Sequence, residues 1–306
     1  MNVVNTIIPI FFVITLGWAA RKKNWIPDTF VDPANSLVFY LAIPAMIFKA
    51  IYSAPLKSNI NITVLVIVLM SMCVTALLAW LAGKAMNVQF TRGTFIQSSY
   101  HGNLGYIGFA VAFYYLGREG LVKTSLIAAF LMILQNLTSV IVLQVYSGDT
   151  RKNQRSMWCV TKKIMCNPVI LAALMGIIFS LSGLKMPSII SRILDIISAL
   201  ALPLALLIIG ATLSFKVARS QPLLLCASSV FKLIILPGLG MFLFRMFDVS
   251  QDLFLPGLIL LAAPTATIAC VMAKEMKGDT EFVVAAVSLN TLLSAFTYTW
   301  WLHVAS

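Results

Sequence analysis

Apolar runs of about the length that crosses a lipid bilayer fill nearly the whole sequence. A helix needs about 20 residues to cross a hydrocarbon core about 30 Å thick. Cutting the sequence at polar, Gly and Pro positions gives ten such runs, at residues 3–20, 33–52, 62–83, 94–116, 121–146, 164–181, 189–215, 222–246, 253–273 and 282–303. Only 10% of the residues are charged, too few to cover a water-exposed surface. We therefore expect an all-α integral membrane protein of ten transmembrane helices.

The longest polar stretch, residues 147–163, divides the chain into two parts of similar size. We expect a single membrane transport domain over residues 1–306, made of the halves 1–146 and 164–306 and a cytoplasmic connector, 147–163. The loops after the odd-numbered runs hold fourteen Lys and Arg residues, against seven on the other face. Because basic residues mark cytoplasmic loops, both termini should lie outside the plasma or inner membrane. The basic residues form no patterned helix, so nucleic acid is not an expected partner.

Short residue patterns recur between the two halves at one displacement, 159 residues. Pro9 and Gly17 of the first run reappear as Pro168 and Gly176 of the sixth. A second motif follows the same displacement: Leu41, Ala42 and Pro44 of the second run correspond to Leu200, Ala201 and Pro203 of the seventh. Five crossings is an odd number, so equivalent helices would enter from opposite faces. Inverted repeats of this kind are typical of secondary transporters.

Glycines and polar residues interrupt the fourth run in mid-span, where residues 98–108 read SSYHGNLGYIG. The ninth run contains Pro264, which lies 159 residues after Gly105 and removes a backbone donor. Transporters bind substrate on helices broken in this way, although small residues can also serve helix packing alone. We predict that helices four and nine are broken and cross, as in bile-acid symporters and NhaA-like antiporters. The candidate crossover and hinge residues are Gly102, Gly105, Gly108, Pro264, Pro44 and Pro203.

The two predicted breaks favour a bound anion. Each half-helix N-terminus carries roughly half a positive charge, and neither break contains Asp or Glu. Asn103, Thr265 and Thr267 would add neutral hydrogen bonds around the anion. Hard cations prefer carboxylates or many oxygens, so the sequence argues against a carboxylate-based cation exchanger.

Further polar residues lie in the fifth run, where Gln135 and Ser139 share a helix face next to Asn136. They either line the same cavity or make interhelical hydrogen bonds, and the sequence leaves both open. Asn290 and Ser294 form a weaker version of this pattern in the tenth run.

Two ionisable residues lie well inside spans, His101 and Lys232, and either could carry a coupling proton. His101 adjoins the predicted break but could equally be a hydrogen-bonded structural histidine. Lys232 could instead snorkel, or bind backbone carbonyls freed by Pro237. The two histidines lack metal-ligand spacing and no enzyme motif is present. We therefore expect no metal, no cofactor and no enzymatic activity.

Several of these segments resemble the auxin efflux carrier family, whose bacterial members are often described as malate or malonate permeases. The match covers nearly the whole chain and rests on NSLVFYLAIP at 35–44, NLGYIG at 103–108, NP at 167–168, LPLAL at 202–206 with GATL at 210–213, KLIILP at 232–237 and APTAT at 263–267. The resemblance implies two inverted five-helix repeats, a scaffold set and a crossover set of helices, and elevator-like transport of organic anions. It also implies roles for Asn103 as a crossover asparagine, for Gln135 as a ligand and for Ser36 near the site.

The sequence thus predicts a secondary transporter of small organic anions, malate-like carboxylates or auxin-like acids. Its predicted substrate-binding residues are Asn103, Gln135, Asn136, Thr265, Thr267 and Ser36. The lipid bilayer and the substrate are the expected partners, and a homodimer stays open. A sodium-coupled symporter of the bile-acid carrier type is the main alternative. A membrane metabolite sensor is the second.

Overall fold

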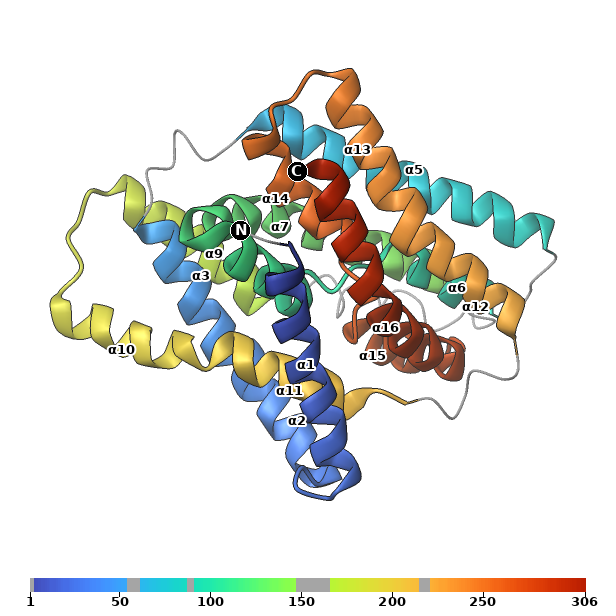
Figure 1. The fold of residues 1–306 in the computed structure, drawn as a ribbon, viewed down its shortest axis with the longest axis horizontal. Helices are drawn as coiled ribbons and strands as arrows, with labels where there is room; N and C mark the ends of the chain where they lie inside the picture. The colour runs from blue at the N-terminus through green and yellow to red at the C-terminus, as the bar shows by residue number, and fades with distance from the viewer. Residues whose placement is uncertain (1–2, 54–60, 87–90, 147–165, 215–220) are drawn as a thin grey trace. The chain divides into compact units, whose positions relative to one another are not determined.

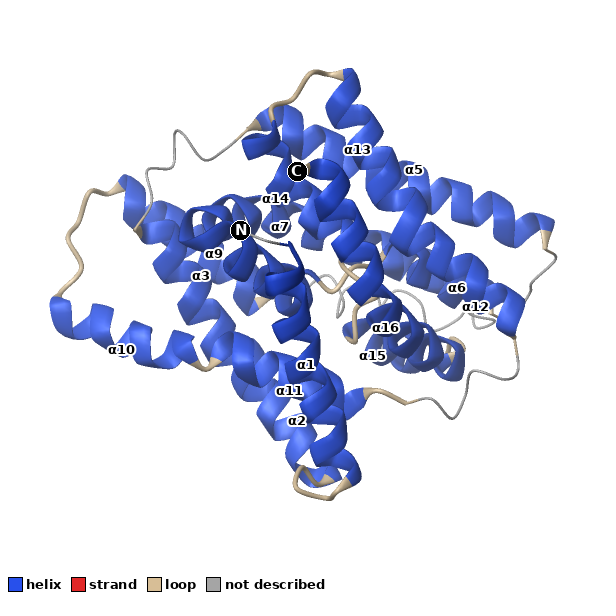
Figure 2. Cartoon of the chain, viewed as in Figure 1, coloured by secondary structure: helices blue, strands red, loops and turns tan. Residues whose placement is uncertain are grey.

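The computed structural model describes residues 3–53, 61–86, 91–146, 166–214 and 221–306. Within these ranges every regular element is a helix (Figure 2). The only extended pairing in the described ranges is an isolated two-residue bridge. The prediction of an all-helical protein is confirmed. The connector 147–163 lies outside the described residues, and so do the first residues of the predicted sixth run.

Seven helical segments of the described chain are long and apolar enough to cross a membrane. They are Val3–Lys22, Asp28–Tyr52, Ile62–Ala85, Leu104–Tyr146, Ser188–Thr212, Pro222–Met246 and Thr280–Ala305. Two shorter apolar helices, Pro168–Leu181 and Gln251–Ala262, accompany them. The chain is therefore a multi-pass membrane protein, whereas the count of ten spans stays a prediction.

The chain folds into two compact units, and each draws on both halves of the sequence. Unit 1 comprises Met1–Asn61, Gly105–Phe130 and Met165–Leu213. Its helices (Figure 1) are α1 (Val3–Lys22), α2 (Asp28–Leu37), the π-helical turn η1 (Val38–Ala42), α3 (Ile43–Tyr52), most of the turn η2 (Leu104–Gly108), the first part of α7 (Phe109–Tyr146), α9 (Pro168–Leu181), α10 (Ser188–Ala199) and α11 (Ala201–Thr212).

Helices α1 and α11 of unit 1 touch backbone to backbone. A Cβ added at Gly17 would lie 2.1 Å from the carbonyl oxygen of Leu207. One added at Gly210 would lie 1.9 Å from that of Ile14. Only glycine permits so close an approach, which is the close-packing role that small residues have between membrane helices.

Unit 2 comprises Ile62–Leu104, Leu131–Ile164 and Ser214–Ser306. Its helices (Figure 1) are α5 (Ile62–Ala85), α6 (Arg92–Tyr100), the second part of α7, α12 (Pro222–Val230), the π-helical turn η3 (Phe231–Ile235), α13 (Leu236–Met246), α14 (Gln251–Ala262), α15 (Ile268–Glu275) and α16 (Thr280–Ala305). Helix α16 packs against α6, α12, α14 and α15. Its buried face therefore supports both helices that the sequence predicted to be broken.

Two prolines predicted as hinges follow irregular helix segments in unit 1. Pro44 lies in the first turn of α3, directly after the π-helical turn η1. Pro203 lies in the first turn of α11, after Leu200, where α10 has ended. Because proline cannot donate to the helix ladder, it is best tolerated in a first turn. The second segment begins earlier than predicted, at Asp28, so that Pro33 falls inside α2.

Helix boundaries in the second half repeat those of the first at the displacement of 159. Helix α15 corresponds to residues 109–116 of α7, and α16 corresponds to residues 121–146. Between these two parts of α7 lies Gly117, with φ 72° and ψ −162°, a conformation outside the helical region. This kink falls where the sequence separates the fourth run from the fifth.

Candidate functional site

Two helix ends in unit 2 meet through an antiparallel backbone bridge. Helix α6 ends at Tyr100 and α14 ends at Ala262, and the chain after each is extended. Gly102 and Thr265 form the bridge, in which Asn103 N donates to Pro264 O at 2.7 Å and Ala266 N donates to His101 O at 2.9 Å. Unpaired backbone groups are costly away from water. Each interrupted helix therefore satisfies backbone groups exposed by the other.

Gln135, on the second part of α7, completes the pairing of Gly102. Its Oε1 accepts from Gly102 N at 3.1 Å and its Nε2 donates to Gly102 O at 3.2 Å. The same carbonyl oxygen also accepts from Leu104 N at 2.9 Å. Gln135 is 4% exposed, so both of its bonds lie in the interior. The sequence suggested that Gln135 binds substrate or bonds between helices, and the structure places its amide on the backbone of the break.

A second chain of hydrogen bonds fixes Thr265. Its hydroxyl donates to the carbonyl oxygen of Ser98 at 2.9 Å and accepts from Asn290 Nδ2 at 2.7 Å. All three residues are buried. The links join α6, the second break and α16, so the hydroxyl that was predicted to bind substrate here holds three segments together.

His101 lies at the first break and is fully buried. Its Nδ1 lies 2.9 Å from Ser139 Oγ, which is also 3.0 Å from Tyr100 Oη. If Tyr100 donates to Ser139 and Ser139 donates to Nδ1, the proton of a neutral imidazole sits on Nε2. Among the described residues, Nε2 has no partner, so that arrangement leaves it as a buried donor.

Lys232 brings a basic amino group to the same place. It lies in η3 and is 0% exposed, and its Nζ donates to the carbonyl oxygen of Leu261 at 2.9 Å. A Cβ at Gly102 would be 3.4 Å from this Nζ, so the ammonium group adjoins the bridge.

Of the two structural interpretations of Lys232 from the sequence, snorkelling is not seen. Binding to a backbone carbonyl is seen, but the acceptor is Leu261 O and not an oxygen freed by Pro237. A wholly buried side chain does not snorkel. Pro237 frees the carbonyl oxygen of Leu233 because it lacks the N–H four residues later. That oxygen accepts from Trp301 Nε1 at 2.8 Å and not from Lys232.

Of the other predicted site residues, Asn103 belongs to the bridge, and the remaining three lie outside it. Asn103 is 6% exposed and belongs to the bridge itself. Thr267 is half-buried at the N-cap of α15. Asn136 is half-buried beside Gln135. Ser36 lies in unit 1, exposed, and donates to the carbonyl oxygen of Asp32.

The glycines predicted as hinges divide between the units. Gly102 lies in the bridge of unit 2. Gly105 and Gly108 belong to the π-helical turn η2 and are assigned to unit 1. The polypeptide therefore passes from one unit to the other directly after the first break.

The residues at the bridge are chemically suited to an anion. The amino group of Lys232 is buried there, and no Asp or Glu occurs between residues 92 and 118 or between 253 and 274. A buried charge is costly unless an opposite charge or several hydrogen bonds compensate it. The sequence indicated Asn290 only weakly and did not predict a role for Ser98, or for Tyr298, whose hydroxyl donates to Ile259 O at 2.9 Å. Their partners are remote in sequence and nothing local marks them.

Long apolar helices, two broken helices paired through their backbones and a buried lysine at the pairing define a multi-pass membrane protein of the transporter class. The chain belongs to the family described as membrane transport protein, whose model matches residues 2–302. This is the auxin efflux carrier family that the sequence motifs indicated. The protein is thus a membrane transporter by family, which is compatible with the expectation of no enzymatic activity.

Curated relatives of similar length agree with this assignment. A protein of Methanothermobacter thermautotrophicus described as an uncharacterized transporter is 22% identical over 304 residues, covering 98% of each chain. A protein of Rhizobium meliloti provisionally named a malonate transporter is 24% identical over 310 residues, covering 99% of this chain and 96% of its own. An uncharacterized transporter of Methanocaldococcus jannaschii is 23% identical over 310 residues, covering 97% of each.

Proposed function

We propose that the protein is a secondary transporter of small organic anions, malate-like dicarboxylates or auxin-like acids, and that the anion binds at the bridge between the two breaks. The observation that carries the proposal is the buried Nζ of Lys232 beside Gly102, at a crossing without acidic residues. A carboxylate bound there would compensate the buried ammonium group.

Helix termini add to the attraction for a carboxylate. Helix α15 begins just after Thr267, and the helical chain resumes at Leu104 just after the bridge. Free N–H groups and the positive end of the helix dipole make such N-termini favourable places for anions. His101 Nε2 is a further candidate donor, and Asn103 lies between the bridge and the resuming helix.

Alternating access through two inverted repeats is part of the proposal, and symmetric contacts support it. In unit 2, the hydroxyl groups of Tyr100 and Ser139 are hydrogen-bonded to each other. The positions 159 residues after these two are Ile259 and Tyr298, and the hydroxyl of Tyr298 donates to the carbonyl oxygen of Ile259. In unit 1, Gly17 approaches Leu207. By the same displacement Gly176 approaches Phe48, whose carbonyl oxygen would lie 3.2 Å from an added Cβ. Contacts that recur in this way are expected when two halves share one fold and exchange roles.

The described structure also favours a second candidate, sodium-coupled symport. Helices α6 and α16 pack against each other and carry buried side-chain oxygens that have no partner among the described residues. These are Gln97 Oε1, Ser98 Oγ, Asn290 Oδ1 and Thr291 Oγ1. Hard cations bind neutral oxygens of this kind. Replacing sodium by choline at constant pH decides between the candidates, since sodium-independent uptake would remove symport.

Uptake of radiolabelled malonate or malate into proteoliposomes tests the proposed site. Asn103→Ala should abolish uptake while leaving expression and thermal stability intact. Thr299→Ala is the control, because Thr299 is half-buried on α16, its hydroxyl donates to Ala295 O within the same helix, and it is not among the predicted site residues. Equal uptake by the two variants would remove Asn103 from the site. The absence of dicarboxylate or auxin-like uptake by the unmodified protein would overturn the substrate class.

A further inference from the structure

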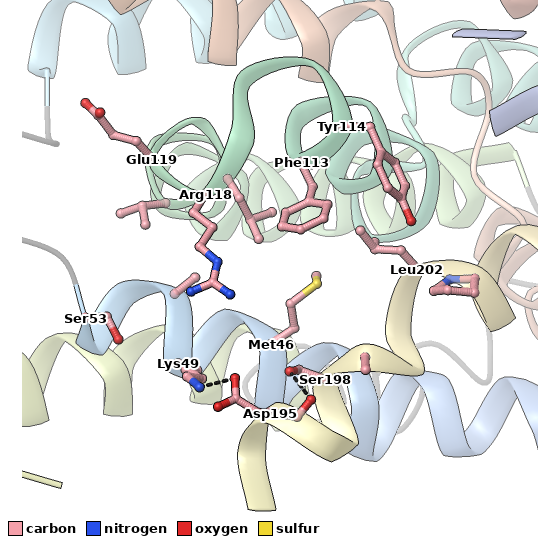
Figure 3. Close-up of a pocket in the computed structure, with 15 residues that line it drawn as sticks. Met46, Lys49, Ser53, Phe113, Tyr114, Arg118, Glu119, Asp195, Ser198 and Leu202 are labelled. Atoms are coloured by element: carbon pink, nitrogen blue, oxygen red, sulfur yellow. Dashed lines mark hydrogen bonds and ion pairs between the residues drawn. The ribbon is translucent and has the colours of Figure 1, made fainter. Parts of the chain in front are cut away.

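A cavity of about 760 Å³ lies within unit 1, and none of the residues that line it belongs to the bridge. Residues from α3, from α7 around its kink at Gly117 and from the junction of α10 and α11 line it (Figure 3). Much of its wall is apolar and includes Met46, Phe113, Leu121 and Leu202. Volumes of about 300–1,000 Å³ are typical of sites for drug-sized ligands. A dicarboxylate of three or four carbons would fill little of this space.

One cation in the cavity wall lacks a compensating carboxylate among the described residues. Lys49 forms an ion pair with Asp195 across the cavity wall. Glu119 pairs with Lys123 at 3.0 Å, and its side chain extends away from the cavity in Figure 3. Arg118 extends from α7 into the cavity toward α3 (Figure 3), and within the described part of the chain it has no ion-pair partner. The cavity therefore combines an apolar wall with a guanidinium group available to an anion.

The helix that carries Asp195 also has an apolar face without a protein partner in the described structure. No residue of α10 is buried there. Ile189 and Ile196 are each 72% exposed, and Ile193 is 49% exposed. In a membrane protein, acyl chains cover such a face. Since residues 195, 198 and 199 of the same helix line the cavity, lipid-facing and cavity-lining surfaces are continuous on α10.

We propose that this cavity binds an acyl amphiphile with an anionic head, and that Arg118 pairs with the head while the acyl chain contacts the apolar wall and α10. A guanidinium group binds carboxylate and phosphate in a bidentate manner, so both headgroup types meet the requirement. The site is distinct from the transport site. It concerns a lipid that occupies unit 1 and not a transported anion.

Native mass spectrometry of the purified full-length protein in detergent tests the proposal. Phosphatidylglycerol and phosphatidylcholine with identical chains, palmitate and inorganic phosphate serve as probes. We expect phosphatidylglycerol or palmitate to bind in preference to phosphatidylcholine. Binding of phosphatidylglycerol identifies a membrane lipid as the source, and binding of palmitate alone identifies a free fatty acid. Equal binding of the two phospholipids, or competition by inorganic phosphate, would overturn the proposal.

Three variants locate the lipid site, because they are expected to weaken, strengthen and leave unchanged the binding of the anionic lipid. Arg118→Gln should weaken anionic-lipid binding roughly fivefold, the contribution of one basic side chain near an anionic head. Asp195→Asn should strengthen it, because Lys49 is released from its ion pair. Lys185→Gln, also in unit 1 but outside the cavity wall and in none of the ion pairs of the described structure, should leave it unchanged.

The same binding measurements on these variants can also refute the proposal. Lipid binding by Arg118→Gln equal to that of the unmodified protein would refute the role of the guanidinium group, and weaker binding by Asp195→Asn would refute the charge argument. Thermal unfolding shows that each variant is folded. Because the readout is lipid binding, failure here leaves the transport proposal standing.

Discussion

Replacing Gln135 by leucine tests whether this side chain holds the break in place or contacts substrate. Leucine has a similar size but neither donates nor accepts, so both bonds to Gly102 would be lost. Gly102 O would keep Leu104 N as a donor. Gly102 N bonds to Gln135 alone within the described residues, and the region is buried, so this amide would be left without an acceptor.

The magnitude follows from the one backbone group left unpaired. A buried group without a partner costs about 1–3 kcal/mol, so Gln135→Leu should lower the free energy of unfolding by about that amount. In proteins of comparable length each kcal/mol lowers Tm by roughly 2–4 °C. A fall of at least about 2 °C in the absence of substrate is therefore expected.

Two measurements check this prediction. Thermal unfolding of the purified variant gives the loss of stability, with Asn136→Leu as control because the neighbouring residue makes no bond to the bridge in the described structure. Hydrogen exchange then locates the effect, since the amide of Gly102 should exchange faster once its acceptor is gone.

A different outcome would show that Gln135 is a ligand. If it only contacts substrate, Gln135→Leu loses uptake while its Tm without substrate equals that of Asn136→Leu. Unchanged exchange at Gly102 would lead to the same conclusion. Either result would refute the positioning role that the two hydrogen bonds indicate.

Two further predictions concern helix packing and the buried cation. Gly17→Ala places a Cβ 2.1 Å from the carbonyl oxygen of Leu207, so the helices must separate at a cost of about 1–3 kcal/mol. Gly176→Ala should cost less, since the nearest atom, Ile51 Cβ, is 3.1 Å away; equal falls in Tm would contradict this. Lys232→Met should reduce anion uptake at least about tenfold through the lost charge. Its Tm should change little, because Leu261 O loses its donor while the cost of burying an ammonium group is removed. Retained uptake would remove Lys232 from the site.

The positions of the helix breaks could be predicted because they depend on local chemistry. Gly102 lies in a run of glycines and polar residues, and Pro264 cannot donate to a helix ladder; the helices end two residues before each of these positions, at Tyr100 and Ala262. The displacement of 159 between the halves reinforced this, since a break in one half had a counterpart in the other.

The partners across the crossing could not be predicted from the sequence. Gln135 looks the same in the sequence whether its amide faces a cavity or the backbone of Gly102, because the residues are 33 positions apart. Asn290 reaches Thr265 only through the packing of α16. The cavity of unit 1 gave no signal either, since it arises where a kink at Gly117 brings Arg118 opposite α3 and α10, segments that are remote in sequence.

The described bonds that close the crossing all lie within unit 2, which bears on how access could alternate. Ser98 and His101 from the first half of the chain bond Thr265 and Ala266 from the second. Gln135 and Asn290 reinforce the crossing from within each half, through Gly102 and Thr265. An elevator-like mechanism requires that one body carry the whole binding site as it moves, since a site shared between bodies would come apart at each step. If the transport site is the bridge, its cross-linking by buried hydrogen bonds keeps its geometry constant through the cycle. Conformational change would then fall at the segments where the chain leaves unit 2, of which the turn η2 after Leu104 is the nearest to the site.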